Sequence, residues 1–281
     1  MDQAASVFSE QGSATFVSFT PSLSARPVKF PPTRPELCFV IAQSFVTSNK
    51  HVTGPILGIS LQGFHDAFFY HNGGSDYAAA KSLTKEEELR RLIDITKETL
   101  TREDGYTREE IASALQMSVP ELEQRFMSRF PVRADRFKLR QRALHVFTEA
   151  LRVVQFLALL EGPLHTGRTD TTQFNEELGR LMNETQDSCR DLYECSCPEL
   201  DEICRISRGA GAYSSRLTGA GWGGCSVHLV PADKVPAVKE ALEQQYYSKL
   251  DLTDEQKEQA VVVSRPARGS AVYIVEGGQL S

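Results

Sequence analysis

The sequence has little of what marks several large classes of protein. Its 281 residues include one tryptophan and four methionines, and no apolar run is as long as a membrane span. The first residues, MDQAASVFSEQGS, lack the basic region and apolar core of a secretory signal peptide. The formal net charge of −6 gives no reason to expect non-specific binding of nucleic acid. These features predict a soluble, cytoplasmic chain of one large domain or two small ones.

The cysteines lack the spacing of a common metal site. Four of the six lie in SCRDLYECSCPELDEIC, at positions 189, 195, 197 and 204, without paired C-x-x-C units. Zinc binding is the alternative that this clustering raises. We predict instead that these are reduced thiols packed on or near helices, and that the chain holds no metal through them.

Hydrophobic patterns predict an α+β fold with strands toward both ends and helices between them. ATFVSF alternates and LCFVIAQSFV is continuously apolar, so strands are expected within residues 14–47. Thr84 is expected to cap the first helix. Helices are expected over residues 83–100, 107–117, 119–130, 135–162, 169–195, 197–209 and 231–250, and strands over 225–230, 261–266 and 269–275. Helices and strands are largely segregated, which favours α+β over a doubly wound sheet.

Glycine is concentrated just before the strand expected at 225–230. Four of the six residues of SSRLTGAGWGGCSVHLV from Gly219 to Gly224 are glycine. A backbone without side chains lets another backbone or an anion approach closely. The pattern is neither G-x-x-x-x-G-K-[ST] nor a G-x-G-x-x-G that opens a helix. From the residues alone, a tight turn in a packed sheet and a loop that handles phosphate are both open.

Several stretches together resemble one family. LTGAGWGGCSVHLV is similar to the third conserved motif of the superfamily of galactokinase, homoserine kinase, mevalonate kinase and phosphomevalonate kinase (GHMP kinases). MDQAAS resembles the galactokinase segment that carries the catalytic aspartate, and SFVTSNKHVTGP resembles its strand and following loop. LMNETQDSCRDLYECSCPELDEICRISR resembles the signature helix pair in its fungal form. The motifs keep the family's order and cover nearly the whole chain.

The resemblance implies ATP-dependent phosphorylation of galactose at its anomeric hydroxyl, with Mg²⁺ as the implied ion. It assigns the catalytic role to Asp2, because a carboxylate beside that hydroxyl can accept its proton or orient it. Asn49 and Lys50 match the family's S-N-K, for which a capped strand end is an equal alternative. The residues placed beside the sugar and the phosphate loop are Thr218, Gly219, Ala220, Gly221, Trp222, Gly223 and Gly224.

Two departures from the family pattern bear on activity. The family's sugar-binding segment and Gly/Ser-rich phosphate loop do not precede MDQ, and a helix-length piece is missing between Pro55 and Ile56. We therefore expect a GHMP-kinase-like fold of antiparallel strands with a helical C-terminal domain of ferredoxin-like character and an incomplete N-terminal domain. Residues 1–55 would be the remnant of that N-terminal domain and residues 56–281 the C-terminal domain. Weak ATP binding and impaired turnover follow, because positioning and charge stabilisation dominate phosphoryl transfer.

Two alternative functions stay open at this point. Some fungal relatives are non-catalytic galactose sensors that bind a transcriptional repressor, and others are N-acetylgalactosamine kinases. The features that separate these classes lie in the phosphate loop and the sugar pocket. The sequence offers neither, so it leaves the choice open. His65, His145, His165 and His228 have no acidic or cysteine partner at a useful spacing, and we expect them to be structural or surface residues.

Overall fold

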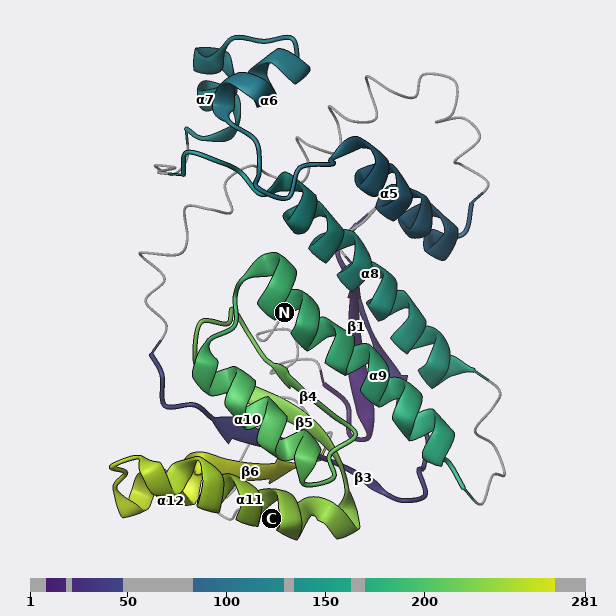
Figure 1. Ribbon diagram of the computed structural model, residues 1–281. Coiled ribbons are helices and arrows are strands. Elements are labelled where there is room, and N and C mark those ends of the chain that lie inside the picture. Colours follow the sequence, from purple (N-terminus) through teal and green to yellow (C-terminus); the bar gives the residue numbers. More distant parts are fainter. Residues whose placement is uncertain (1–8, 19–21, 48–82, 129–133, 163–169, 266–281) are drawn as a thin grey trace, which may run out of the picture.

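The described residues combine a four-stranded sheet, a two-stranded ribbon and surrounding helices (Figure 1). The computed structural model describes residues 9–18, 22–47, 83–128, 134–162 and 170–265. The α-helices in these ranges are α5 (Lys85–Thr99), α6 (Arg108–Ala114), α7 (Val119–Phe126), α8 (Leu139–Glu161), α9 (Thr172–Ser188), α10 (Pro198–Gly209), α11 (Val235–Gln245) and α12 (Asp254–Ala260). The strands are β1 (Ser13–Ser18), β2 (Ser24–Lys29), β3 (Leu37–Gln43), β4 (Ser214–Leu217), β5 (Cys225–Pro231) and β6 (Val261–Ser264).

The strand β3 lies inside the four-stranded sheet, whose order is β4-β5-β3-β6. It runs antiparallel to β5 over its whole length, with Leu37 opposite Pro231 and Gln43 opposite Cys225. Its other edge pairs with β6, also antiparallel. Because β3 has a neighbour on each side and packing on each face, its first six residues, Leu37 to Ala42, are all apolar rather than alternating. The buried strand expected here is confirmed.

Two hydrophobic cores cover the two faces of this sheet. Successive side chains of a strand point to opposite faces. Val40 and Val230 therefore pack on one side, with residues of α10 and α11. Phe39 and Leu229 pack on the other, with residues of α8, α9 and β2. The second core carries the cavity described below.

Helix starts follow the capping signals in the sequence. Thr84 caps α5, as expected, and accepts a hydrogen bond from the backbone N–H of Glu87, whose carboxylate accepts one from the N–H of Thr84 in return. The same reciprocal box begins α6 at Thr107 and α7 at Ser118. These two short helices pack around a small core of their own and lie beyond one end of α8, away from the sheet (Figure 1).

By length and composition alone, α8 could cross a membrane. Its side chains are nevertheless divided between two cores: Phe147 and Leu151 pack against α5, and Leu160 packs with α9 and β2. The buried residues of the helix are Ala143, Phe147, Leu151 and Leu160. Glu149 and Arg152 interrupt the apolar run of this helix, so no uninterrupted span was expected here.

Several elements differ from expectation. The short strand β4 and helix α12 were not predicted, and the helix expected over 169–195 ends in a π-helical turn, Cys189–Tyr193. The strand expected over 269–275 lies outside the described residues, as does the domain boundary expected after residue 55. The division into two domains therefore stays a prediction, although β3, from the first 55 residues, shares its sheet with strands from the end of the chain.

His228 shows how the core satisfies a buried polar group. Its side chain is fully buried, and its Nδ1 lies 2.8 Å from Ser215 Oγ while Nε2 lies 3.0 Å from Ser226 Oγ. Burial, with a smaller effect of the Arg208 charge, lowers the pKa of His228 to about 3. The imidazole is therefore neutral in the folded protein, and its role is structural, as expected for this residue.

His228 predicts a loss of stability in mild acid. The unfolded chain takes up a proton near pH 6.5, whereas the folded protein resists protonation until about pH 3, so acid favours unfolding. Between pH 7.5 and 5 the linked loss in the free energy of unfolding is about 2 kcal/mol. Denaturant unfolding at several pH values measures it. His228→Gln should flatten this dependence, and an unchanged pH slope in that variant would contradict the assignment.

Candidate functional site

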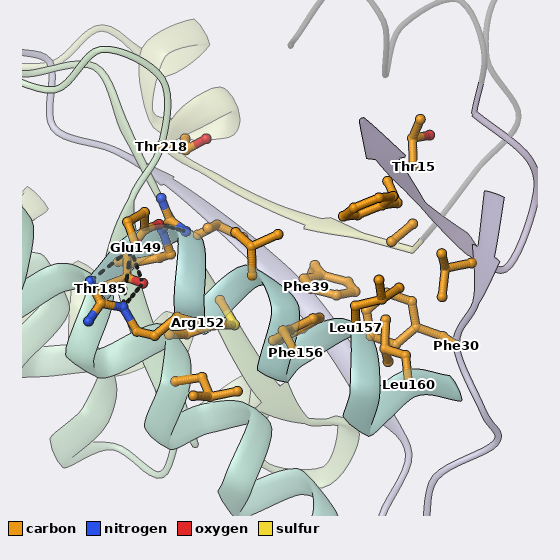
Figure 2. Close-up of a pocket in the computed structure, with 18 of the residues that line it drawn as sticks. Thr15, Phe30, Phe39, Glu149, Arg152, Phe156, Leu157, Leu160, Thr185 and Thr218 are labelled. Carbon is orange, nitrogen blue, oxygen red and sulfur yellow. Dashed lines mark hydrogen bonds and ion pairs between the residues drawn. The ribbon is translucent and has the colours of Figure 1, made fainter. Parts of the chain in front are cut away.

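A cavity of about 710 Å³ opens between the β1–β2 ribbon, α8, α9 and the start of the glycine-rich loop. Its two ends differ in character (Figure 2). Phe30, Phe39 and Phe156 gather at one end with Leu157 and Leu160, and the Phe30 and Phe39 rings meet edge to face with centroids 5.5 Å apart. Polar groups of α8, α9 and β4 form the other end. The cavity can thus present an apolar wall and a charged wall to one ligand.

Glu149 is the centre of the polar end. Its Oε2 accepts hydrogen bonds from Arg152 Nη2 at 2.9 Å and from Thr185 Oγ1 at 2.8 Å. Its Oε1 lies 3.6 Å from Arg216 Nη1. One carboxylate therefore faces two guanidinium groups, so this end of the cavity keeps an excess of positive charge. Such an end favours an anion.

The glycine-rich loop, Thr218 to Gly224, has a backbone that few other sequences could adopt. Gly219, Gly221, Gly223 and Gly224 all have positive φ, between 73° and 134°. Trp222 also has a positive φ, of 54°. The left-handed region costs L-residues with side chains free energy, which explains the density of glycine here.

The second half of the loop is anchored against two other segments. The Trp222 N–H donates to the Cys195 carbonyl at 2.6 Å, and the Gly224 N–H donates to the Val46 carbonyl at 2.9 Å. A Cβ on Gly221 would come within 2.1 Å of the Cys195 oxygen, and one on Gly223 within 2.3 Å of the Val46 oxygen. Glycine is required at both positions because the neighbouring carbonyl group leaves no room for a Cβ. This half of the loop matches the structural role left open above.

The first half of the loop faces the cavity instead. Thr218, Gly219 and Ala220 line the cavity and are exposed. A Cβ on Gly219 would meet nothing within 4 Å. Among the described residues, no group accepts a hydrogen bond from the backbone N–H of Gly219, Ala220 or Gly221. Successive free N–H groups next to a pair of arginines are suited to charged oxygens.

The structure brings together only part of the predicted site. Thr218, Gly219 and Ala220 lie at the cavity, while the residues from Gly221 to Gly224 hold the loop in place. The predicted site residues Asp2, Asn49 and Lys50 lie outside the described residues. The sequence analysis missed Glu149, Arg152 and Arg216. For the first two, the signal was a pair of charges within the mostly apolar stretch of α8 from Ala143 to Leu160.

All six cysteines are free thiols. The four of the cluster lie on or next to α9 and α10, and three of these four are buried. Among the described residues, no group of three or more His, Cys, Asp or Glu side chains is arranged to hold a metal ion. His145, expected to be structural, is half-buried, with its Nδ1 2.9 Å from Ser188 Oγ. His65 and His165 lie outside the described residues.

The fold and one C-terminal segment resemble those of the GHMP kinases. The family model described as GHMP kinases C terminal matches residues 171–249, which run from the start of α9 to the turn after α11. Among solved structures, galactokinase of Lactococcus lactis complexed with galactose superposes with a TM-score of 0.51 at 20% identity, over 96% of this chain and 54% of that one. The expected α+β, GHMP-kinase-like fold is confirmed.

Within that class, the chain is similar in sequence to galactokinases over nearly its whole length. It is 37% identical to galactokinase of Saccharomyces cerevisiae over 97% of its own length and 59% of the relative's. Galactokinase of Dictyostelium discoideum is 35% identical over 97% of this chain and 58% of its own length. The chain thus spans about 59% of the length of the S. cerevisiae relative.

Alanine substitutions separate the two halves of the loop. Gly219→Ala meets open space and should cost only the strain of a positive φ, about 1 kcal/mol in the free energy of unfolding. Gly221→Ala carries the same strain and also overlaps the Cys195 carbonyl, so it should cost about 1–3 kcal/mol more. Chemical denaturation of both variants compares them, and equal losses would contradict the anchored geometry.

Loss of the Glu149 charge should destabilise the protein. Glu149→Gln leaves Arg152, whose side chain is only 11% exposed, without its ionic partner, and we expect a loss of about 1–3 kcal/mol. Glu202→Gln is a matched control, because Glu202 and Arg205 have the same i,i+3 spacing with both side chains more than a third exposed. That control should cost less than about 0.5 kcal/mol. Equal losses in denaturant unfolding would show that Glu149 has no special role.

Proposed function

We propose that this chain provides one wall of a galactokinase-type site, which phosphorylates galactose at the anomeric hydroxyl with ATP as donor. The observation that carries the proposal is the glycine-rich loop, whose cavity half presents backbone N–H groups beside an arginine-rich cavity end. Homology to galactokinases over 97% of the chain supports the choice of substrate. The alternatives of a galactose-sensing co-regulator with a repressor partner and of an N-acetylgalactosamine kinase have no observation in their favour.

In this proposal the loop and the arginines act on negative charge. The N–H groups of Gly219 and Ala220 would donate to phosphate oxygens, and Arg152 and Arg216 would offset the charge that builds up as the phosphoryl group moves. The residues present fit an anionic ligand, because Glu149 neutralises only one of the two guanidinium groups. ATP, when bound, supplies the phosphoryl group. Asp2 would orient the sugar hydroxyl or accept its proton.

Mg²⁺ has a weaker basis in this chain. Of the described residues that line the cavity, Glu149 alone carries a carboxylate, and arginines and Thr185 already hold it. A cation there would have to displace them. We therefore derive no step through the metal. A cytoplasmic location, expected from the sequence, stays a prediction.

Thermal unfolding of the full chain with galactose and MgATP tests the proposal. Ligand that binds only the folded state stabilises it, and a concentration ten times the dissociation constant adds about 1.4 kcal/mol. For a chain of this size that raises the midpoint by about 2–4 °C. Because the sequence predicts weak ATP binding, millimolar ligand is the right range. Glucose with MgATP is the control for sugar specificity.

A shift with galactose and MgATP that glucose does not give supports the proposal. No shift with any combination of these ligands, in a chain that unfolds cooperatively, overturns it. Asp2→Ala separates binding from chemistry. This variant should keep the thermal shift and lower any turnover about 10²-fold or more, because Asp2 acts on the proton of the attacking hydroxyl.

A further inference from the structure

Two cysteine thiols meet where α9 ends. The helix passes into the π-helical turn Cys189–Tyr193, and Glu194 then takes a left-handed conformation with φ of 59°. This closes the turn, so that the N–H of Cys195 donates to the carbonyl of Cys189 at 2.9 Å. Helix ends of this type usually bring two hydrophobic side chains into contact across the turn. Here Cys189 and Cys195 stand on the two sides of the turn, and both belong to one buried cluster with Leu200 and Leu217.

The environment makes the two thiols unequal. The neighbouring Cys195 thiol, with the nearby charge of Arg216, holds the pKa of the Cys189 thiol below its usual value. The same contact and burial raise the pKa of the Cys195 thiol. Cys189 is therefore the better nucleophile and Cys195 the proton-bearing partner. Their exposed fractions are 6% and 3%, so only a small reagent reaches them.

The same turn holds the glycine-rich loop. The Cys195 carbonyl accepts the N–H of Trp222 at 2.6 Å, and the Glu194 carbonyl accepts the indole Nε1–H of Trp222 at 3.0 Å. Gly221 lies against the Cys195 carbonyl with no room for a side chain. Any movement of Cys195 must therefore move Gly221 and Trp222.

We propose that Cys189 and Cys195 are an oxidation site that closes into a reversible disulfide and shifts the glycine-rich loop. The oxidant is a small peroxide such as hydrogen peroxide. The Cys189 thiolate attacks one peroxide oxygen, the O–O bond breaks, and Cys189 becomes a sulfenic acid with release of hydroxide. The Cys195 thiol then attacks the Cys189 sulfur and water leaves. In sum, two thiols and one hydrogen peroxide give one disulfide and two waters.

Closure changes the geometry of the turn. A disulfide holds its sulfur atoms about 2.05 Å apart, well inside the contact distance of two thiols, and it suits residues as close as those joined by a direct backbone hydrogen bond. Pulling the sulfurs together moves the Cys195 backbone against Gly221. Gly221 directly follows the cavity half of the loop. Oxidation of the two cysteines therefore changes the wall of the cavity, although neither cysteine lines it.

The chain reports this movement through its single tryptophan, Trp222. The reduced full chain is treated with hydrogen peroxide, then analysed by intact mass, by peptide mapping without reduction, and by tryptophan emission. We expect a loss of about two mass units, from two hydrogens, a Cys189–Cys195 cross-linked peptide, and a change in emission. Dithiothreitol should reverse all three.

Variants provide the controls. Cys195→Ser should lose both the cross-link and the emission change. Cys195→Ala is a second variant should the first unfold, which circular dichroism reveals. Cys197→Ser is the matched control: it removes the more exposed thiol of the same cluster and should behave like the unmodified chain.

Three results would overturn the proposal. One is a cross-link that joins other cysteines, and another is peroxide treatment that leaves Cys189 and Cys195 as thiols or drives them separately to sulfinic acid. The third is a Cys189–Cys195 disulfide with unchanged Trp222 emission, which would sever the link between oxidation and the loop. None of these readouts depends on kinase activity, so the outcome is independent of the proposed function.

Discussion

The close approach of two carbonyl oxygens to the glycine-rich loop is the contact on which the site depends. The oxygens of Cys195 and Val46 lie where Cβ atoms of Gly221 and Gly223 would be. Val46 follows β3, Cys195 follows the end of α9, and the loop joins β4 to β5. The contact therefore ties three distant parts of the chain together. It fixes which backbone groups of the loop remain free to face the cavity.

The cavity combines the wall formed by this loop with charged side chains from other elements of the fold. Glu149 and Arg152 come from α8, Thr185 from α9 and Arg216 from β4, directly before the loop. Glu149 holds both guanidinium groups in place while leaving net positive charge. The loop provides direction through its N–H groups, and the arginines provide charge, so the two parts suit the same class of ligand.

Local patterns in the sequence predicted much of the fold but not the assembly of the site. Thr84 and the apolar run at 37–46 identified a helix start and a buried strand, because capping and burial act over a few residues. Helix α12 was missed, since its short polar sequence has no apolar period. Glu149 and Arg216 are 67 residues apart in the chain, and the packing of α8 against α9 and of α9 against β4 brings them together. The glycines in the sequence indicated that another backbone could approach closely. That this backbone belongs to Cys195 and Val46 depends on tertiary contacts, which no local pattern contains.

The place of β3 in the sheet has a consequence for how the protein is made. Both strands that flank it, β5 and β6, begin at residue 225 or later, so the ribosome makes them long after β3. Contacts across such long separations form slowly, and an apolar strand without neighbours invites pairing with other chains. During synthesis, nearly two hundred residues are therefore added after β3 before β5, the first strand that pairs with it in the sheet, is complete. A ribosome that stalls before residue 225 would release a chain in which β3 lacks both strands that it pairs with, β5 and β6.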